Sequence, residues 1–246
     1  MVRQELLKRY AGTLGGTLWA LLNPLATILV FWLVFSKGLK VAPDGGIPYI
    51  LYFIGGFVPW LAFSESISAS CASIIANEHL VKKIAFPTET LPLVYLATSL
   101  VVHLFLIAVI FALILAHGMT PHVSAFAVIY YAAGLLTLSL GMGWLLSALN
   151  VFFRDTQQIL GVLLNIWFWL TPIVWPADLV PKAFQALLTL NPLYFVVDGY
   201  RRALIYGEMV NPDLLAHAIF WLTAVLIFIL GATVFRRLKP EFAEVL

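Results

Sequence analysis

Charged side chains and cysteine are scarce in this sequence. Only 11% of its 246 residues are charged, and the single cysteine, Cys71, can form neither a disulfide framework nor a cysteine-based metal site within one chain. The formal charge of +2 is too small to indicate a nucleic-acid partner. The N-terminus lacks the apolar core and the small-residue cleavage site of a secretory signal peptide. We therefore expect neither a disulfide-stapled secreted protein nor a nucleic-acid-binding one.

The motifs of common enzyme classes are absent as well. The sequence has no G-x-x-x-x-G-K-[ST] phosphate loop, no H-E-x-x-H zinc pair and no G-x-S-x-G nucleophile elbow. The five histidines show no metal-ligand spacing, and the apolar segments contain one carboxylate, Glu65. Proton-coupled transport needs more membrane carboxylates than this. We expect no catalytic residue, metal or cofactor in this chain, which disfavours an intramembrane enzyme and a secondary transporter.

Apolar residues, by contrast, are abundant. They make up 62% of the chain, and the mean hydropathy of +0.99 is far above that of a water-soluble domain. Because about 20 apolar residues cross a bilayer as a helix, the sequence predicts an all-α integral membrane protein with a single transmembrane domain over 1–246. Six transmembrane helices are predicted, at 18–35, 49–76 with a cytoplasmic extension, 91–116, 123–149, 159–174 and 214–235.

The basic residues predict the orientation of these spans. An even number of spans places both termini on the same side of the membrane. Nine of the 14 lysines and arginines fall on that side and five on the other. Since cytoplasmic loops carry the excess of basic residues, both termini are predicted to be cytoplasmic.

Two shorter segments have helical patterns but are too short to span. Residues 1–17 alternate apolar and basic faces at helical spacing, which indicates an amphipathic interface helix or, alternatively, an extension of the first span. Residues 177–207 contain two apolar pieces of about 10 to 14 residues separated by Asn191-Pro192, which breaks a helix. This second pattern predicts a short re-entrant helical hairpin at the outer face, between helices 5 and 6.

Polar residues inside these apolar segments allow more than one interpretation. Arg201 and Arg202, on the outer side, either reach lipid phosphates or belong to a gate or anion-contacting element. Ser66, Ser70 and Ser73 share one helix face, which suits a wet cavity, a subunit interface or a polar helix end in the cytoplasm.

Residues 165–176 are unusually aromatic. Trp175 lies at the outer end of the fifth span, where indole rings favour the membrane interface. Trp167 and Trp169 lie about 12 to 15 Å along the helix, near the middle of the membrane. Because successive aromatic side chains point around much of a helix, we expect Trp167, Phe168 or Trp169 to line a channel. The alternative is ordinary packing against neighbouring spans.

The cytoplasmic loop at 77–87 carries a short amphipathic pattern. Leu80, Val81 and Ile84 form an apolar stripe that Pro87 ends. Such a helix either lies on the lipid surface or is presented to a cytoplasmic partner. The loop is too short to contain an ATPase, so any ATP must be hydrolysed by another chain.

Along nearly its whole length the sequence resembles the transmembrane permease of a type-2 ABC exporter, in the group that exports O-antigen, capsular polysaccharide or teichoic acid. Single motifs are weak, but their order and spacing across the spans are specific. The matching residues are Arg9-Tyr10 with Gly15, Trp19 and Pro24; Asn77, Leu80, Lys83 and Phe86-Pro87 with Pro92; Arg154-Asp155; Thr171-Pro172-Ile173; and Asn191-Pro192-Leu193 with Arg201.

The resemblance implies a function and partners. Similar proteins form homodimers in the bacterial inner (cytoplasmic) membrane and bind two copies of an ABC ATPase, which holds the ATP and Mg. Their substrate is a lipid-linked polysaccharide, an O-antigen-like glycan on polyprenyl pyrophosphate. A type-2 permease for drugs or small lipids is the alternative, because it shares the topology.

The resemblance also implies roles for particular residues. Arg9 and Arg201 are candidates to contact the lipid pyrophosphate, and the gate helices include Asn191, Pro192 and Tyr194. The coupling helix to the ATPase comprises Glu78, Leu80, Val81, Lys82, Lys83, Ile84 and Phe86.

Overall fold

The computed structural model describes residues 16–41, 43, 46–82 and 86–246. Every regular element in these ranges is helical, which confirms the predicted all-α class. The predicted interface helix at 1–17 lies outside the described residues, apart from the start of the short turn η1 (Gly16–Leu18).

Five of the six predicted spans are present as long helices. Each is long and apolar enough to cross a membrane, which identifies a multi-pass membrane protein. They are α2 (Trp19–Trp32) continued by the π-helical η2 (Leu33–Gly38), α3 (Tyr49–Ala76), α5 (Thr90–Ala116), α6 (Val128–Phe152) preceded by η4 (Val123–Ala127), and α10 (Leu214–Leu238).

The remaining span, predicted at 159–174, corresponds to a helix that begins three residues earlier and also ends earlier. Helix α7 (Thr156–Leu170) ends four residues before the predicted end at 174. Thr171 has an extended backbone, and Pro172 cannot donate a backbone hydrogen bond, so the helix stops there. Fifteen helical residues rise about 22 Å, which is short of the roughly 30 Å hydrocarbon core. The described structure therefore contains five candidate spans and a shorter sixth helix.

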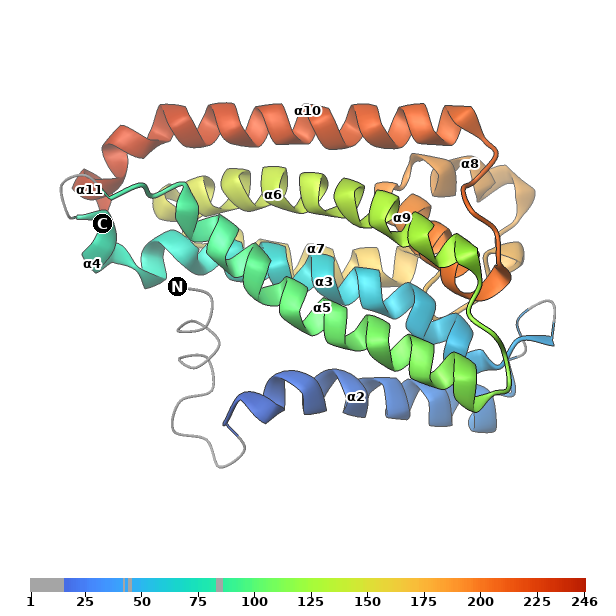
Figure 1. Cartoon of the computed structure of the whole chain (residues 1–246). Helices are drawn as coiled ribbons and strands as arrows, with labels where there is room; N and C mark the ends of the chain where they lie inside the picture. The colour runs from blue at the N-terminus through green and yellow to red at the C-terminus, as the bar shows by residue number, and fades with distance from the viewer. Residues whose placement is uncertain (1–15, 42, 44–45, 83–85) are drawn as a thin grey trace.

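Two short helices connect α7 to α10. They are α8 (Lys182–Leu190) and α9 (Pro192–Arg201), which η6 (Arg202–Tyr206) extends. Pro192 stands in the first turn of α9, where its missing N–H costs nothing, so the predicted break at Asn191-Pro192 is confirmed. Both helices lie at the end of the bundle opposite the C-terminus (Figure 1).

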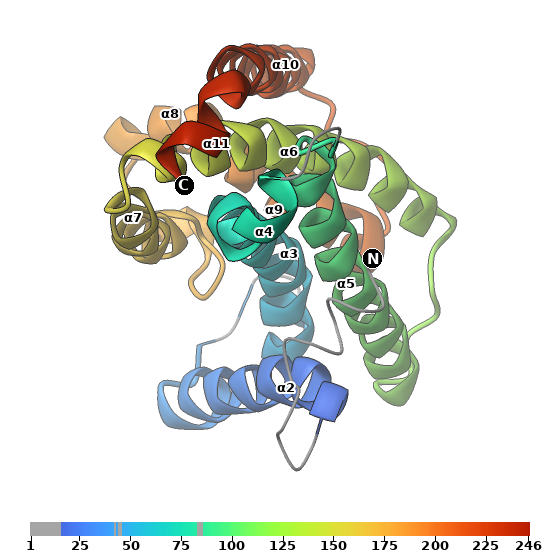
Figure 2. The ribbon, with the colours of Figure 1, turned by 90° about the vertical axis from the view of Figure 1, so that its left-hand side faces the viewer.

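Helix α3 is the centre of the bundle. In the end-on view it lies between α2, α5, α6 and α7, and it packs against each of them and against α9 (Figure 2). Helix α10 packs mainly against α6, where Gly141 and Gly231 bring the two backbones together. A Cβ atom on Gly231 would lie 2.0 Å from the Gly141 carbonyl oxygen, so this contact depends on residues without side chains.

The serine face of α3 is inside the protein. Ser66, Ser70 and Ser73 are each at most 2% exposed, and the Ser70 hydroxyl donates to the Pro92 carbonyl at 3.3 Å. Because the chain itself buries all three serines, this face is neither exposed for a subunit interface nor a polar helix end exposed to the cytoplasm. The serines instead allow α3 to pack closely against α5 and α6.

A second, smaller core closes the C-terminal end of the bundle. It contains the side chains that α4 (Glu78–Val81) and α11 (Phe242–Val245) bury against four long helices, α3, α5, α6 and α10. Its buried members are Ile74, Val81, Leu91, Ala148, Val151, Phe235 and Phe242.

Candidate functional site

The segment after α7, residues 171–175, is not helical, yet four of its successive carbonyl groups accept side-chain hydrogen bonds. The donors come from α3 and α9. They are Arg201 Nη1 to Pro172 O (2.7 Å), Arg201 Nη2 to Ile173 O (2.7 Å), Tyr49 Oη to Val174 O (2.9 Å) and Tyr52 Oη to Trp175 O (2.9 Å). Irregular backbone at membrane depth is tolerated only where protein or water supplies such partners. We call residues 171–175 with these three side chains the carbonyl clamp.

Arg201 is the central residue of the carbonyl clamp. It is 3% exposed, and its Nε donates to the Tyr52 carbonyl at 3.0 Å while its guanidinium lies 3.6 Å from the centre of the Tyr52 ring. A buried charge is tolerated when dipoles and rings surround it in this way. All three guanidinium nitrogens donate to backbone carbonyl groups, and the pyrophosphate role of Arg201 stays a prediction.

The neighbouring Arg202 is held differently. Its Nε pairs with the Asp198 carboxylate at 2.6 Å, one turn earlier in α9, and its Nη1 pairs with Glu208. These partners lie within the same local segment. Of the two adjacent arginines, therefore, only Arg201 joins α9 to α3 and to residues 171–175.

Asn191 joins the end of α7 to the start of α9. Its Oδ1 accepts from Trp167 Nε1 at 2.9 Å and caps α9 by accepting from Leu193 N at 3.0 Å. Its Nδ2 donates to Thr171 Oγ1 at 2.9 Å. The Thr171 hydroxyl already donates its hydrogen to the Trp167 carbonyl, so it can only accept a hydrogen bond from residue 191. An asparagine amide can donate this bond, whereas an ionised aspartate cannot. This explains the Asn-Pro pair chemically.

The three aromatic residues predicted to line a channel have different surroundings. Trp167 and Phe168 are half-buried and point toward α3, where their rings lie 5.4 Å from Phe63 and 5.6 Å from Trp60. Trp169 is 51% exposed. Trp169 alone among the three offers most of its ring to the surroundings of the chain.

Helix α7 also carries exposed amides that the sequence analysis did not single out. Only Leu160 and Leu164 are buried on this helix, whereas Gln158 and Asn165 are exposed and share one face with Gly161. An unpaired amide facing lipid costs free energy. The sequence signal that could have identified this face is the spacing of Gln158, Gly161 and Asn165 at positions i, i+3 and i+7.

A cavity lies beside the carbonyl clamp. Its volume is about 190 Å³, and it contains the predicted gate residue Tyr194. The polar and aromatic lining residues are Tyr52, Asp178, Tyr194, Asp198, Arg201 and Tyr206. Phenol rings can contact the C–H faces of a sugar, and carboxylates can accept hydrogen bonds from its hydroxyl groups. The cavity therefore has the chemistry of a carbohydrate contact.

The predicted coupling segment is split between core and surface. Val81 is 8% exposed in the smaller core, and Leu80 and Phe86 pack against that core. The interpretation that this apolar stripe is presented to a partner is wrong for Val81, because the protein's own α11 and α3 cover it. The exposed members are Glu78, His79 and Lys82, while Lys83 and Ile84 lie outside the described residues, as does Arg9.

No group of three or more His, Cys, Asp or Glu residues that could hold a metal ion occurs in the part of the chain searched, which is the described part. The buried His103 instead lies beside a tyrosine of α9, with Tyr200 Oη 3.0 Å from its Nε2. This pair, like the carbonyl clamp, connects a long helix to α9.

Comparison with known proteins adds independent information. The sequence model described as ABC-2 type transporter matches residues 1–205. The chain is 31% identical to an O-antigen export system permease protein RfbA of Klebsiella pneumoniae, over 100% of this chain and 93% of that protein. It is 33% identical to RfbA of Myxococcus xanthus over 99% and 93%. It is 28% identical to the polysialic acid transport protein KpsM of Escherichia coli, over 83% and 79%.

Proposed function

This chain belongs to the ABC-2 type transporter family of membrane permeases, and we propose that it moves a lipid-linked polysaccharide across the bacterial cytoplasmic membrane. The predicted family resemblance is thereby confirmed. Permeases of this family are not themselves catalysts, and the ABC class implies that a separate ATPase subunit hydrolyses ATP.

The observation that carries the proposal is the surface of α7. An exposed indole, Trp169, stands on the same short helix as the exposed amides of Gln158 and Asn165. A glycan in transit needs weak, repeated contacts to rings and to hydrogen-bonding groups, and this surface offers both. The relatives named for O-antigen export and polysialic acid transport support the same class of substrate.

We place α7 toward a second copy of the chain, with the translocation path between the two subunits. In a homodimer, protein and water replace lipid around the amides of α7, which removes the cost of exposing them to hydrocarbon. Residues 171–176 continue α7 to the outer face and complete a sixth crossing, with both termini in the cytoplasm. Helices α8 and α9 form the re-entrant gate hairpin, with Asn191, Pro192 and Tyr194 at its joint.

Two copies of the ATPase engage the exposed face of the coupling segment. Glu78, His79 and Lys82 are available for this contact, and Lys83 and Ile84 belong to the same segment of sequence. Since Val81 and Phe86 pack against the smaller core, a movement of the ATPase at α4 is transmitted to α3, α6 and α10 through that core.

Copurification tests the coupling surface. We expect Glu78→Lys combined with Lys82→Glu to lose the ATPase while the permease keeps its thermal stability. Gln185→Lys, an exposed substitution in α8 at the opposite end, is the control and should retain the ATPase. Retention of the ATPase by the double variant would contradict the assignment.

Surface glycan measured in a deletion strain tests the function itself. The wild-type gene should restore the glycan, and Trp169→Ala should restore much less of it at equal protein level. Phe126→Ala, which removes a 72% exposed aromatic side chain before α6, is the control. A deletion that leaves surface glycan intact and changes drug sensitivity would support the alternative, a permease for drugs or small lipids.

The pyrophosphate contact needs its own test. Arg9→Ala and Arg201→Ala should each reduce export of the lipid-linked glycan at normal protein level. Arg201→Lys separates the two possible roles of Arg201, because lysine keeps the charge but cannot make the three directed hydrogen bonds of the carbonyl clamp. Unchanged export in both alanine variants would exclude these residues as pyrophosphate ligands.

A further inference from the structure

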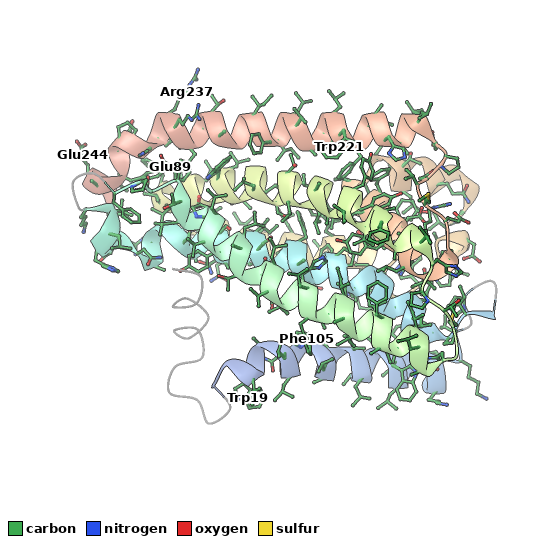
Figure 3. The ribbon with its side chains drawn as sticks, in the orientation of Figure 1. Trp19, Glu89, Phe105, Trp221, Arg237 and Glu244 are labelled. Atoms are coloured by element: carbon green, nitrogen blue, oxygen red, sulfur yellow. The ribbon has the colours of Figure 1, made fainter. Side chains whose placement is uncertain are left out.

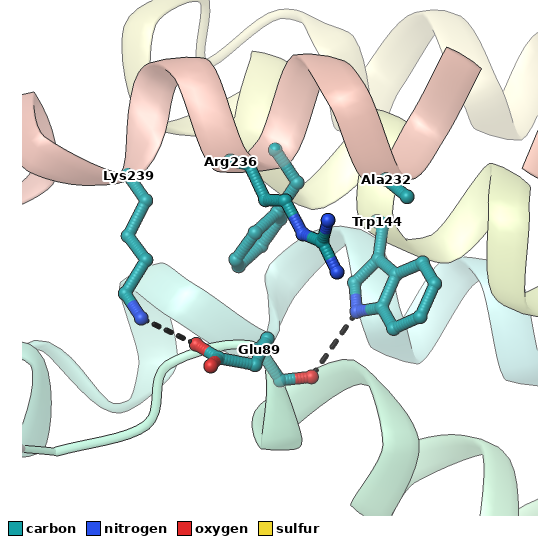
Figure 4. Close-up of a pocket in the computed structure, with 6 residues that line it drawn as sticks. Glu89, Trp144, Ala232, Arg236 and Lys239 are labelled. Carbon is teal, nitrogen blue, oxygen red and sulfur yellow. Dashed lines mark hydrogen bonds and ion pairs between the residues drawn. The ribbon is translucent and has the colours of Figure 1, made fainter. Parts of the chain in front are cut away.

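A second cavity lies at the opposite end of the bundle from the carbonyl clamp, between the start of α5, α6 and the end of α10. Its volume is about 110 Å³, well above the roughly 10 to 15 Å³ that one water molecule needs. Figure 4 shows the side chains around it. The lining residues are Glu89, Trp144, Ala232, Phe235, Arg236 and Lys239. We call it the α10 pocket.

The α10 pocket carries an excess of positive charge. Lys239 Nζ donates to the Glu89 carboxylate at 2.6 Å, and this hydrogen bond lowers the pKa of Glu89, which is therefore ionised near neutral pH. Arg236 extends its guanidinium into the same space (Figure 4). Within the described residues Arg236 has no hydrogen bond or ion pair. Two cations thus face one carboxylate, and one guanidinium is free to bind an anion.

The floor of the α10 pocket is fixed in place. Trp144 Nε1 donates to the Glu89 carbonyl at 3.1 Å, which ties α6 to the residue that precedes α5 (Figure 4). Ala232, on α10, has only a methyl group and leaves the space above the indole open. The pocket is therefore held open by an ordered tryptophan and a small residue.

An apolar groove lies next to the α10 pocket, between the same three helices. Its volume is about 320 Å³. The ring of Phe228 in this groove lies 5.4 Å from the ring of Trp144, so the two spaces are neighbours. The groove is lined by Leu93, Leu96, Ala97 and Leu100 of α5, Leu136, Thr137 and Leu140 of α6, and Phe228 of α10. A cationic pocket at the helix ends thus has an apolar groove beside it, farther along the spans.

We propose that the α10 pocket binds the phosphate of an anionic membrane phospholipid whose acyl chain lies in the groove between α5, α6 and α10. A guanidinium donates to phosphate in a fork geometry, and basic residues at the end of a membrane helix lie at the level of lipid headgroups. A free phosphate ion satisfies the pocket but leaves the groove unexplained. A phospholipid fills both, and it holds α10, which packs mainly against α6, onto α5 as well.

Lipid retention by the purified full-length permease tests this proposal. The protein is exchanged from mixed phosphatidylcholine and phosphatidylglycerol bilayers into detergent, and bound lipids are counted by native mass spectrometry. We expect the wild type to retain phosphatidylglycerol selectively. Arg236→Gln should reduce this retention at least about tenfold, because it removes charge-assisted hydrogen bonds to the phosphate. Equal retention of both lipids by the wild type would overturn the proposal.

The chain supplies a matched control for the charge. Arg237 follows Arg236 directly but points away from the bundle (Figure 3), so Arg237→Gln should retain phosphatidylglycerol as the wild type does. Ala97→Phe tests the groove, because it fills the acyl site without changing a charge, and it should reduce retention too. If Arg236→Gln does not fold, Ala97→Phe decides the question, since normal retention there would overturn the proposal.

Two further outcomes identify other sources of the phosphate. Inorganic phosphate that raises the thermal stability of the wild type but not of Arg236→Gln in pure phosphatidylcholine, with no lipid selectivity, would assign the pocket to a free anion. Recovery of a polyprenyl pyrophosphate lipid in place of phosphatidylglycerol would assign it to the substrate. Either result would overturn the phospholipid assignment.

Discussion

Helices α3 and α7 run through the same bundle and both are rich in apolar residues, but they are buried very differently. The chain covers α3 on almost every face, so that Leu51, Phe53, Val58 and Phe63 are fully inaccessible. On α7 only Leu160 and Leu164 are buried, Trp167 and Phe168 are half-buried against α3, and most of the other residues, including the amides of Gln158 and Asn165, are exposed. Apolar composition therefore does not distinguish a helix at the centre of the bundle from one that the rest of the chain leaves mostly exposed.

The largest expected effect comes from breaking the attachment of α3 to the segment after α7. Arg201→Met removes three hydrogen bonds to buried carbonyls and should lower the free energy of unfolding by about 3 to 5 kcal/mol. Arg202→Met is the matched control. Its side chain is 29% exposed and its ion-pair partners 21% and 54% exposed, so the loss of these pairs should cost no more than about 1 kcal/mol. Thermal unfolding in detergent measures both. Equal losses of unfolding free energy in the two variants would contradict the conclusion that only Arg201 joins α9 to α3 and to residues 171–175.

A pair of leucines compares the helices directly. Leu51→Ala opens a cavity in α3 and should cost about 2 to 5 kcal/mol, whereas Leu163→Ala on the exposed face of α7 should cost less than about 0.5 kcal/mol in the detergent-solubilised monomer. Denaturant titration gives the two values. A large loss for Leu163→Ala in the monomer would mean that α7 is covered by its own chain.

Two asparagines allow a further comparison, since Asn191 bonds to the end of α7 and Asn165 is exposed on α7. Asn191→Leu removes the cap of α9 and the bonds to Trp167 and Thr171, and should cost about 1 to 2 kcal/mol. Asn165→Leu should leave the stability of the monomer unchanged. It should nevertheless reduce export, since it removes an amide from the proposed path. The same glycan assay and an unfolding curve report the two effects separately, and normal export would remove Asn165 from the path.

The smallest expected effect lies outside both helices, at the ion pair of Glu89 with Lys239. The hydrogen bond from Lys239 lowers the pKa of Glu89 in the folded state. The pair therefore stabilises the fold at pH values above the ordinary glutamate pKa of 4.5, and this contribution disappears as the pH falls through the lowered pKa. The two side chains are 46% and 38% exposed, so the effect is at most about 1 kcal/mol. In Glu89→Gln, the free energy of unfolding should therefore fall less as the pH is lowered below 4.5, which thermal unfolding at a series of pH values measures.

The sequence predicted the elements whose cause is local. Hydropathy located the five long spans, and Asn191-Pro192 marked the junction of α8 and α9 because proline and an asparagine cap act within a few residues. Thr171-Pro172 is also a local signal for the end of α7. The predicted span nevertheless continued to 174, because the residues after Pro172 are apolar.

Features caused by contacts between distant residues were not predicted. Arg201 was expected at an anion site, whereas its partners lie about 30 and 150 positions away in the chain, at Pro172 and Ile173 and at Tyr52. Val81 fitted the apolar stripe of a surface helix, yet Phe242 at the other end of the sequence helps to cover it. Hydrophobic periodicity shows which face of a helix is apolar but does not identify what covers that face.

The carbonyl clamp also limits how the end of the bundle opposite the C-terminus can move. The guanidinium of Arg201 is one rigid plane, and its three bonds tie Tyr52, Pro172 and Ile173 to a single side chain. A shift of α9 by more than a hydrogen-bond length breaks these bonds together, leaving several buried groups without partners at once. Any displacement of α9 that breaks these bonds would therefore be an all-or-none step between two discrete positions and not a gradual change.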